Sequence, residues 1–226
     1  MPLGSGRTRG PRAEREVLSR IKRTPRGSRA MEFETAVRKR RMVRHYKPDP
    51  VPKEAVDRML ELALHAPSAG FSQGSAFVVV TDPDMRRRVG ILQGEEGYSA
   101  GGFHKWISEA PVSIIACVSE KVYHDRYREK DKVKDDGTEI DWPTPYWFFD
   151  IGAGCMIILL AAVDSGLAAS FTGTFDVRGI RKLLGIPETF HPVGVISLGR
   201  PDKDVKSPSL KRGRRPLSDV VHYGRW

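Results

Sequence analysis

The chain has 226 residues, of which 39% are hydrophobic and 29% are charged, as in soluble globular proteins. This composition excludes a chain that is too polar to form a core. Lysine and arginine number 38 against 28 for aspartate and glutamate, so the formal net charge is +10. Nine basic and two acidic residues lie in residues 1–30, so this segment contributes +7 and residues 31–226 only +3.

Residues 1–30 are rich in Gly, Pro, Ser and Arg and contain few large apolar side chains. Such a segment buries too little apolar surface to offset its ordering entropy, so we expect a disordered, solvated extension. The alternative is a phosphate- or nucleic-acid-binding arm, which the lack of aromatic residues for base stacking disfavours. Met31 opens a sequence with helical periodicity, which makes it a candidate for the natural or an alternative start. We therefore predict one folded domain over residues 31–226.

No apolar stretch is long enough to cross a bilayer, because the longest, around Cys155–Val163, falls far short of the ~20 residues required. The chain opens without the charged, apolar and small-residue pattern of a secretory leader. Cys117 and Cys155 lie within apolar runs and form no C-x-x-C pair, which indicates buried free thiols in a reducing compartment. We therefore expect a cytoplasmic protein without a membrane segment.

Helices and strands alternate irregularly after residue 31. Apolar residues at i, i+3 and i+4 predict an amphipathic helix that begins at Phe33 and ends in a basic stretch. Buried runs rich in β-branched residues predict four strands, at Phe77–Thr81, Val112–Val118, Leu167–Thr172 and Val193–Leu198. Further helices are predicted at Pro52–Ala66, Asp150–Ser165 and Val177–Leu184. This order predicts an α+β fold with a mixed central sheet flanked by helices.

The common catalytic and metal-binding motifs are missing from the sequence. Its six histidines form no H-x-x-x-H or H-E-x-x-H pair, and the two cysteines are far apart, so we predict no metal site. The sequence has no G-x-S-x-G elbow, no Walker A loop and no G-x-G-x-x-G after a strand. These absences leave serine hydrolases, P-loop NTPases and Rossmann dehydrogenases without support.

Two basic clusters, residues 38–44 and 211–215, lie at opposite ends of the predicted domain. In a helix, side chains three or four positions apart share a face, so Arg40, Arg41 and Arg44 are expected to converge on one phosphate. The alternative is a basic, solvated helix end. The small-residue turn at 66–73 lets backbone approach a flat ligand closely, although it is also compatible with an ordinary connecting loop.

These features together resemble the nitroreductase family of FMN-dependent oxidoreductases. The similarity begins at the Arg-Arg-x-Val-Arg run and the Ala-Pro-Ser-Ala-Gly turn, and it covers residues 31–226. It continues through the sequence motifs that begin at Asp150, Asp164, Phe171, Leu184, Val195 and Arg214. Each motif is weak by itself, whereas their order and spacing together are fairly specific.

The resemblance implies a three-layer α+β fold and an intertwined homodimer with two FMN sites at the subunit interface. Pro67, Ser68 and Ala69 would reach the flavin from the other subunit, and the Thr172–Gly173 turn would lie against the ring. The full set of implied cofactor-binding residues is Arg40, Arg41, Met42, Arg44, Pro67, Ser68, Ala69, Gln73, Thr172, Gly173, Arg212 and Arg214. The sequence departs from the family at Met42, where many members have serine, at Phe71, where many have asparagine, and at Gly74–Ser75, where Pro-Trp is usual.

The activity that the resemblance implies is a ping-pong cycle. NAD(P)H would reduce tightly bound, non-covalent FMN, and the flavin would then reduce a nitroaromatic, quinone or similar flat acceptor. The flavin carries this chemistry, so no catalytic side chain is predicted.

An acceptor pocket is expected beside the aromatic stretch of residues 142–149 and the glycine-rich residues 94–102. Phe71, Trp142, Tyr146 and Trp147 are its candidate pocket or lid residues, with packing in the core or dimer interface as the alternative for the aromatic stretch. Two other functions stay open. One is a flavin-dependent dehalogenase or biosynthetic dehydrogenase on the same scaffold, and the other is a basic nucleic-acid-binding or flavin-binding protein without turnover.

Overall fold

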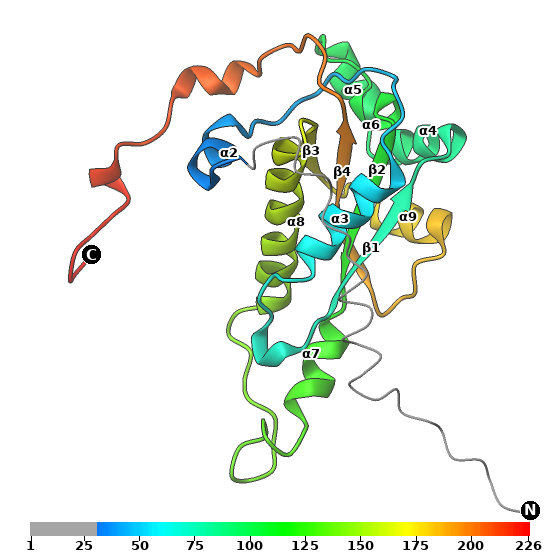
Figure 1. The fold of residues 1–226 in the computed structure, drawn as a ribbon. Helices are drawn as coiled ribbons and strands as arrows, with labels where there is room; N and C mark the ends of the chain where they lie inside the picture. Colours follow the sequence, from blue (N-terminus) through cyan, green and yellow to red (C-terminus); the bar gives the residue numbers. More distant parts are fainter. Residues whose placement is uncertain (1–30) are drawn as a thin grey trace, which may run out of the picture. The chain divides into compact units, whose positions relative to one another are not determined.

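A four-stranded β-sheet lies at the centre of residues 31–226, the part of the chain that this computed structural model describes (Figure 1). The prediction for residues 1–30 lies outside these described residues. The strands are β1 (Ser75–Val80), β2 (Val112–Val118), β3 (Ala168–Gly173) and β4 (His191–Gly199). Their order in the sheet is β1-β2-β4-β3, and each neighbouring pair is antiparallel.

The α+β class is confirmed, but the predicted mixture of strand directions is wrong for the described residues. A helical connection between two strands often indicates a parallel crossover. Here the connection from β1 to β2 contains three helices that bring the chain back to the end of the sheet it left, so β2 runs antiparallel to β1.

Helices flank the sheet on both sides. The longer ones are α2 (Phe33–Lys39), α3 (Lys53–Ala63), α4 (Pro83–Leu92), α7 (Glu120–Tyr127), α8 (Tyr146–Asp164) and α9 (Val177–Leu184). The shorter ones are α5 (Glu95–Ala100) and α6 (Trp106–Glu109), with the 3-10 turns η1 (Ala69–Phe71), η2 (Pro208–Arg212) and η3 (Leu217–Asp219).

Alternating residues of β2 divide the hydrophobic core into two layers. Ile114 and Ala116 face the layer formed with α3 and α8, where Met59 and Ile158 are fully buried. Ile115 faces the opposite layer with α4, α6 and α9. Successive strand residues point to opposite faces, so this unbroken apolar strand is buried on both. The result is the expected three-layer arrangement.

Helix α8 is the central element of one layer. Of the described helices, α8 is the one whose length and apolar composition would suffice to cross a membrane. Half of its apolar stretch is, however, buried inside the domain. Its burial against α3 and the sheet explains the apolar composition as that of a core helix. The helix begins at Tyr146, four residues before the predicted start, because Pro145 can occupy the N-cap position without losing a helical hydrogen bond.

Candidate functional site

Residues 40–46, the arginine strap, run beside the edge strand β3. The strap follows α2, which ends at Lys39. The Val43 N–H donates to the Ala169 carbonyl at 3.4 Å, and the Phe171 N–H donates to Met42 Sδ at the same distance. These contacts place the strap next to the end of β3, where the Thr172–Gly173 turn begins.

Tyr46 anchors the strap in the core. Its side chain is 4% exposed, and its hydroxyl lies 2.5 Å from the Val43 carbonyl, 3.1 Å from Ser170 Oγ and 3.1 Å from the Ser197 carbonyl. Burial raises the pKa of Tyr46 far above its ordinary value, so the hydroxyl stays protonated and can donate. The strap is therefore held by the core of its own chain.

The strap arginines do not converge through helical spacing, because α2 ends before them and this part of the prediction is wrong. Arg41 lines a cavity of about 300 Å³ together with Lys39. The Arg44 guanidinium lies 5.5 Å from the ring centres of Phe103 and Trp106, a cation–π arrangement. Arg40 differs from both, because its Nη1 is buried and has no hydrogen-bond partner within residues 31–226.

A buried guanidinium N–H without a partner is costly, so the Arg40 environment fits an anion. A phosphate oxygen accepts such a bond without needing a proton. The strap also contacts the segment that follows the glycine-rich stretch, since the His45 and His104 rings stack with centres 3.5 Å apart. One short segment thus joins β3 to residues 101–106.

Arg212 and Arg214 lie in an exposed C-terminal arm, which we define as residues 205–226. In Figure 1 the arm leads away from the sheet in orange and red. Its hydrogen bonds within the described chain stay inside the arm, as between the Arg215 guanidinium and the Asp219 carbonyl at 2.6 Å. A single chain therefore does not bring these two arginines into hydrogen-bond contact with the strap.

The turn at residues 66–73 has a strained and well-braced backbone. Phe71 and Gln73 have positive φ angles of 57° and 56°, in a region that side chains other than glycine rarely adopt. Gly70 also has a positive φ, and a Cβ there would lie 2.6 Å from the Tyr127 ring. Backbone strain of this kind persists only where surrounding contacts impose it, and it clusters at functional sites.

Asp150 supplies one of the bracing contacts. This carboxylate is 4% exposed, and its Oδ2 accepts hydrogen bonds from the Ala69 N–H and the Tyr123 hydroxyl, both at 2.8 Å. Arg126 completes the brace by donating to the Gly70 carbonyl at 3.0 Å. Asp150 belongs to α8 and Arg126 to α7, so both helices determine the conformation of the turn.

The remaining predicted contacts of the turn and of β3 are accessible. Gln73 is exposed, and its N–H donates to Ser68 Oγ at 3.1 Å. Phe71 is 74% exposed, and Pro67 is exposed as well. Gly173 ends β3 with an exposed backbone, which leaves room for a flat ligand beside the strand.

The predicted lid aromatics divide into a buried group and an exposed group. Trp147 is only 6% exposed and belongs to the core, where its ring lies 6.0 Å from Tyr123 and 5.7 Å from Trp142. Trp142 is half-buried and Tyr146 is 45% exposed; Phe149, which was not among the predicted lid residues, is 69% exposed. Trp147 therefore occupies the position expected of a core residue, while Tyr146 remains available to a ligand or partner.

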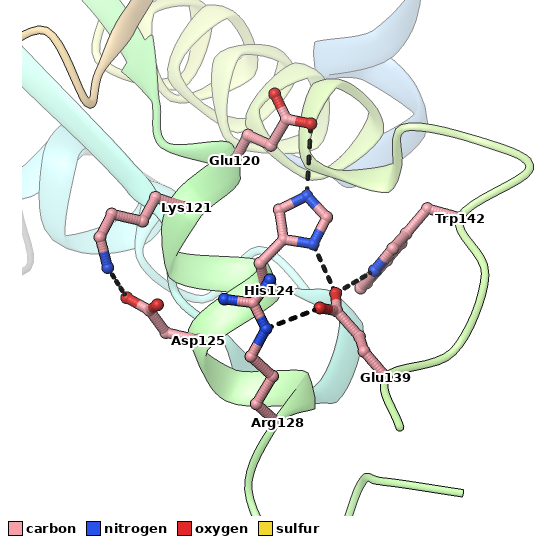
Figure 2. A network of polar contacts seen from close by, with 7 residues as sticks. All are labelled: Glu120, Lys121, His124, Asp125, Arg128, Glu139 and Trp142. Carbon is pink, nitrogen blue, oxygen red and sulfur yellow. Dashed lines mark hydrogen bonds and ion pairs between the residues drawn. The ribbon is translucent and has the colours of Figure 1, made fainter. Parts of the chain in front are cut away.

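A polar network holds the segment that follows α7 against that helix (Figure 2). Glu139 is at its centre: it is hydrogen-bonded to His124, accepts from Trp142 Nε1 at 2.6 Å and pairs with Arg128 at 3.0 Å. His124 also lies 3.3 Å from Glu120 on the preceding turn. Glu139 thus ties the end of the loop that leads to Trp142 to α7, while Asp131 ties its start through Arg126.

Charges within this network shift two pKa values in opposite directions. The hydrogen bond to Glu139 raises the pKa of His124 above its ordinary 6.5, against the opposing effect of burial. Burial acts to raise the pKa of Glu139, but the hydrogen bonds from His124 and Trp142 outweigh it, so its pKa lies below the ordinary 4.5. Both groups are therefore charged over a shared range of pH.

The structure thus assembles the strap, the end of β3 and the glycine-rich stretch, whereas the C-terminal arginines stay apart. Sequence patterns did not identify Tyr46 or Glu139 as structural contributors, or the bracing role of Asp150. The signal available for Asp150 was an acidic residue near the start of a largely apolar helix. Within residues 31–226, no group of three His, Cys, Asp or Glu side chains is arranged to hold a metal ion.

Comparison with known proteins gives consistent results. A relative from Methanothermobacter thermautotrophicus, named for NADH dehydrogenase and NAD(P)H nitroreductase, is 30% identical over 202 residues, covering 87% of this chain and 88% of its own. Iodotyrosine deiodinase 1 of Pongo abelii is 28% identical, and the aligned region covers 85% of this chain and 68% of that protein.

A solved structure supports the fold independently. The nitroreductase family protein of Streptococcus pneumoniae superposes with a TM-score of 0.67 at 21% identity, covering 84% of this chain and 99% of that chain. The model of the Nitroreductase family matches residues 37–200, which include the strap, the braced turn and the whole sheet. The chain therefore belongs to the nitroreductase family.

Proposed function

We propose that this protein is an FMN-dependent oxidoreductase that takes electrons from NAD(P)H and passes them to a flat aromatic acceptor. The observation that carries the proposal is the buried Arg40 Nη1 without a partner among the described residues, on a strap bonded to β3. Family membership supplies the chemical context.

The residues present fit a flavin mononucleotide. Arg40 offers a charge-assisted donor to the phosphate, and the strap leads from there to Thr172 and Gly173 at the end of β3. Exposed backbone at Gly173 can lie against a flat ring. Met42 presents a thioether that is already engaged with the Phe171 N–H, so the phosphate would rely on the arginines.

Bound FMN supplies hydride acceptance and donation, which no side chain can provide. The protein's part is to bind, to orient and to exclude water. Asp150 and Arg126 hold the turn at 66–73 in its strained form, so its small residues are pre-organised for a flat ligand. Backbone N–H groups beside the ring would stabilise negative charge developing there.

The site would be completed by a second copy of the chain. Apolar side chains are exposed along α8 and the arm, including Phe149, Met156, Leu210 and Leu217. Exposed apolar surface on this scale marks an interaction surface. In a homodimer the arm would bring Arg212 and Arg214 to a phosphate, while Pro67–Ala69 would approach the partner's flavin. The buried free cysteines suit a cytoplasmic setting.

Reconstitution tests the proposal directly. The purified protein is titrated with FMN, and the bound flavin is then exposed to NADH or NADPH without oxygen. We expect one FMN per chain, bleached by at least one nicotinamide and reoxidised by an aromatic acceptor. A protein that binds no FMN under these conditions would contradict the proposal.

Reductive dehalogenation is the second candidate, because relatives named iodotyrosine deiodinase align over 81–85% of this chain. A panel of iodinated, brominated and halogen-free phenols, assayed for halide release with the FMN-loaded protein, separates the two activities. Halide release that matches or exceeds quinone and nitroaromatic reduction would favour dehalogenation.

A binding protein without turnover is a third possibility, because much of the net charge lies in residues 1–30. Removing residues 1–30 distinguishes it. We expect FMN affinity and reduction to remain and any DNA affinity to disappear, and loss of all binding together would favour a binding role for the extension.

A further inference from the structure

A second cavity opens beside the end of β3, at the glycine-rich stretch. Its volume is about 300 Å³, and among the described residues it is lined by Gln93, Gly94, Gly97, Tyr98 and Phe175. The volume lies at the lower end of the range for small-molecule sites. Phe175 follows Gly173 by two residues, so the cavity lies close to the proposed flavin ring.

Gln93 contributes a hydrogen-bond donor that the protein does not use. The residue is fully buried, and its Oε1 accepts from the Phe175 N–H at 3.1 Å, which fixes the orientation of the amide. Its Nε2 is then left without a partner in residues 31–226. A buried donor without a partner is unfavourable, so it favours a ligand that carries an acceptor oxygen.

The lining also defines the polarity of the ligand. Tyr98 and Phe175 provide two aromatic walls with ring centres 6.4 Å apart, and no lining residue is charged. Glu95 is nearby but is fully occupied, because its carboxylate accepts from the N–H groups of Ile107 and Ser108 and from Ser108 Oγ. A carboxylate or phosphate ligand would therefore find no countercharge in this cavity.

The same contacts make the cavity pre-formed. The hydrogen bonds of Glu95 tie the first turn of α5 to the start of α6. Gly97 lies on α5. A Cβ at Gly97 would meet no atom within 4 Å, so the space in front of it is open. The cavity is thus open at Gly97 without displacement of a neighbouring atom.

We propose that this cavity binds a neutral quinone-type acceptor, with one carbonyl oxygen accepting from Gln93 Nε2 and the ring against Tyr98 and Phe175. A carbonyl oxygen is a stronger acceptor than a nitro oxygen, so quinones are favoured over nitroaromatics. This assignment rests on the proposed function, because it identifies the acceptor of the same redox site.

Equilibrium dialysis with two matched probes tests the assignment in the FMN-reconstituted protein. Duroquinone carries two carbonyl groups, and durene has the same four methyl groups without them. We expect duroquinone to bind about 5- to 10-fold more tightly than durene, as one buried hydrogen bond predicts.

Two variants examine the cavity and the donor separately. Gly97→Leu fills the open space and should weaken binding of both probes at least about 10-fold, while Ala100→Leu, on the same helix but outside the lining, should leave both unchanged. Gln93→Met removes the Nε2 donor together with the oxygen that accepts from the Phe175 N–H. It should weaken duroquinone about 5-fold, and unchanged durene binding would show that the aromatic wall at Phe175 has stayed in place.

Unchanged binding of both probes to Gly97→Leu would overturn the cavity as the site. An equal loss for duroquinone and durene in Gln93→Met would overturn the role of the donor. FMN titration of each variant runs in parallel with the dialysis. If the native protein binds no FMN, the proposed function fails. Binding of the two probes to the FMN-free protein still tests whether the cavity is a binding site.

Discussion

The arginine strap and the C-terminal arm carry the two basic clusters of the domain, but they are held in opposite ways. The strap is fixed by its own chain, through Tyr46 and its three buried hydrogen-bond partners. The arm makes hydrogen bonds only within itself among the described residues, and its Tyr223 and Trp226 side chains are 90% and 101% exposed.

This difference indicates what one chain can build by itself. An arm without its own core gains too little from burial to offset the entropy of ordering it. In the proposed homodimer, its exposed apolar side chains would gain that burial against a second copy. The strap would then supply one half of the proposed phosphate site by itself, and the other half would form only on dimerisation.

Removal of the arm should give the largest effect. We expect a chain ending at residue 204 to lose dimerisation and to bind FMN about 100-fold more weakly, because two charge-assisted contacts are lost. Sedimentation equilibrium and FMN titration measure the two effects. The matched control, Arg212→Ala with Arg214→Ala, should stay dimeric while binding FMN weakly. A truncated chain with native FMN affinity would contradict the two-part site.

Tyr46→Phe should destabilise the strap and leave the arm unaffected. The substitution removes a hydroxyl that lies within hydrogen-bond distance of the Val43 carbonyl, Ser170 Oγ and the Ser197 carbonyl. Its single proton serves one of these buried acceptors at a time, so the free energy of unfolding should fall by about 2 kcal/mol. Urea denaturation of the FMN-free protein measures it. Tyr223→Phe in the exposed arm is the control and should change stability by less than about 0.5 kcal/mol. Equal losses in the two variants would argue against the contrast.

Arg40→Ala examines the strap donor itself. We expect FMN affinity to fall about 10-fold, since one charge-assisted hydrogen bond to the phosphate is removed. Arg38→Ala is a matched control, because Arg38 is exposed and pairs with Glu34 on the same helix. Titrations of both variants with FMN and with riboflavin measure the two affinities. A similar loss for riboflavin, which lacks the phosphate, would place Arg40 elsewhere in the site.

The sequence predicted individual helices and strands better than the contacts that shape the candidate site. Val112–Val118 and Val177–Leu184 match the observed elements residue for residue, because a β-branched run and a glycine cap are local signals. The site depends on contacts between distant parts of the chain. Asp150 braces Ala69 across 81 positions and Tyr46 reaches Ser170 across 124, and no local pattern encodes such pairs.

The segment from 120 to 142 illustrates the same limit. Only Tyr123 is buried in α7, so the helix lacks the periodic apolar face that would have predicted it. Its order comes from a charged network around Glu139 (Figure 2). Like the strap, this segment is closed by its own chain, but through partly exposed charges rather than a buried hydroxyl.

His124→Gln should therefore give the smallest effect, and one that depends on pH. The raised pKa of His124 means that its stabilisation is complete below pH 6.5 and is lost as pH rises through the folded-state value. The lowered pKa of Glu139 means that its stabilisation is complete above pH 4.5 and is lost as pH falls through its folded-state value.

The network is thus strongest between about pH 4.5 and 6.5. Native protein should exceed His124→Gln in unfolding free energy by less than about 1 kcal/mol at pH 5.5, because the pair is partly exposed, and the difference should shrink by pH 9. Urea titrations at both pH values measure it, with His222→Gln in the arm as the control. A difference that is the same at both pH values would mean that His124 contributes packing rather than charge, and the segment would then be closed by the same kind of contact as the strap.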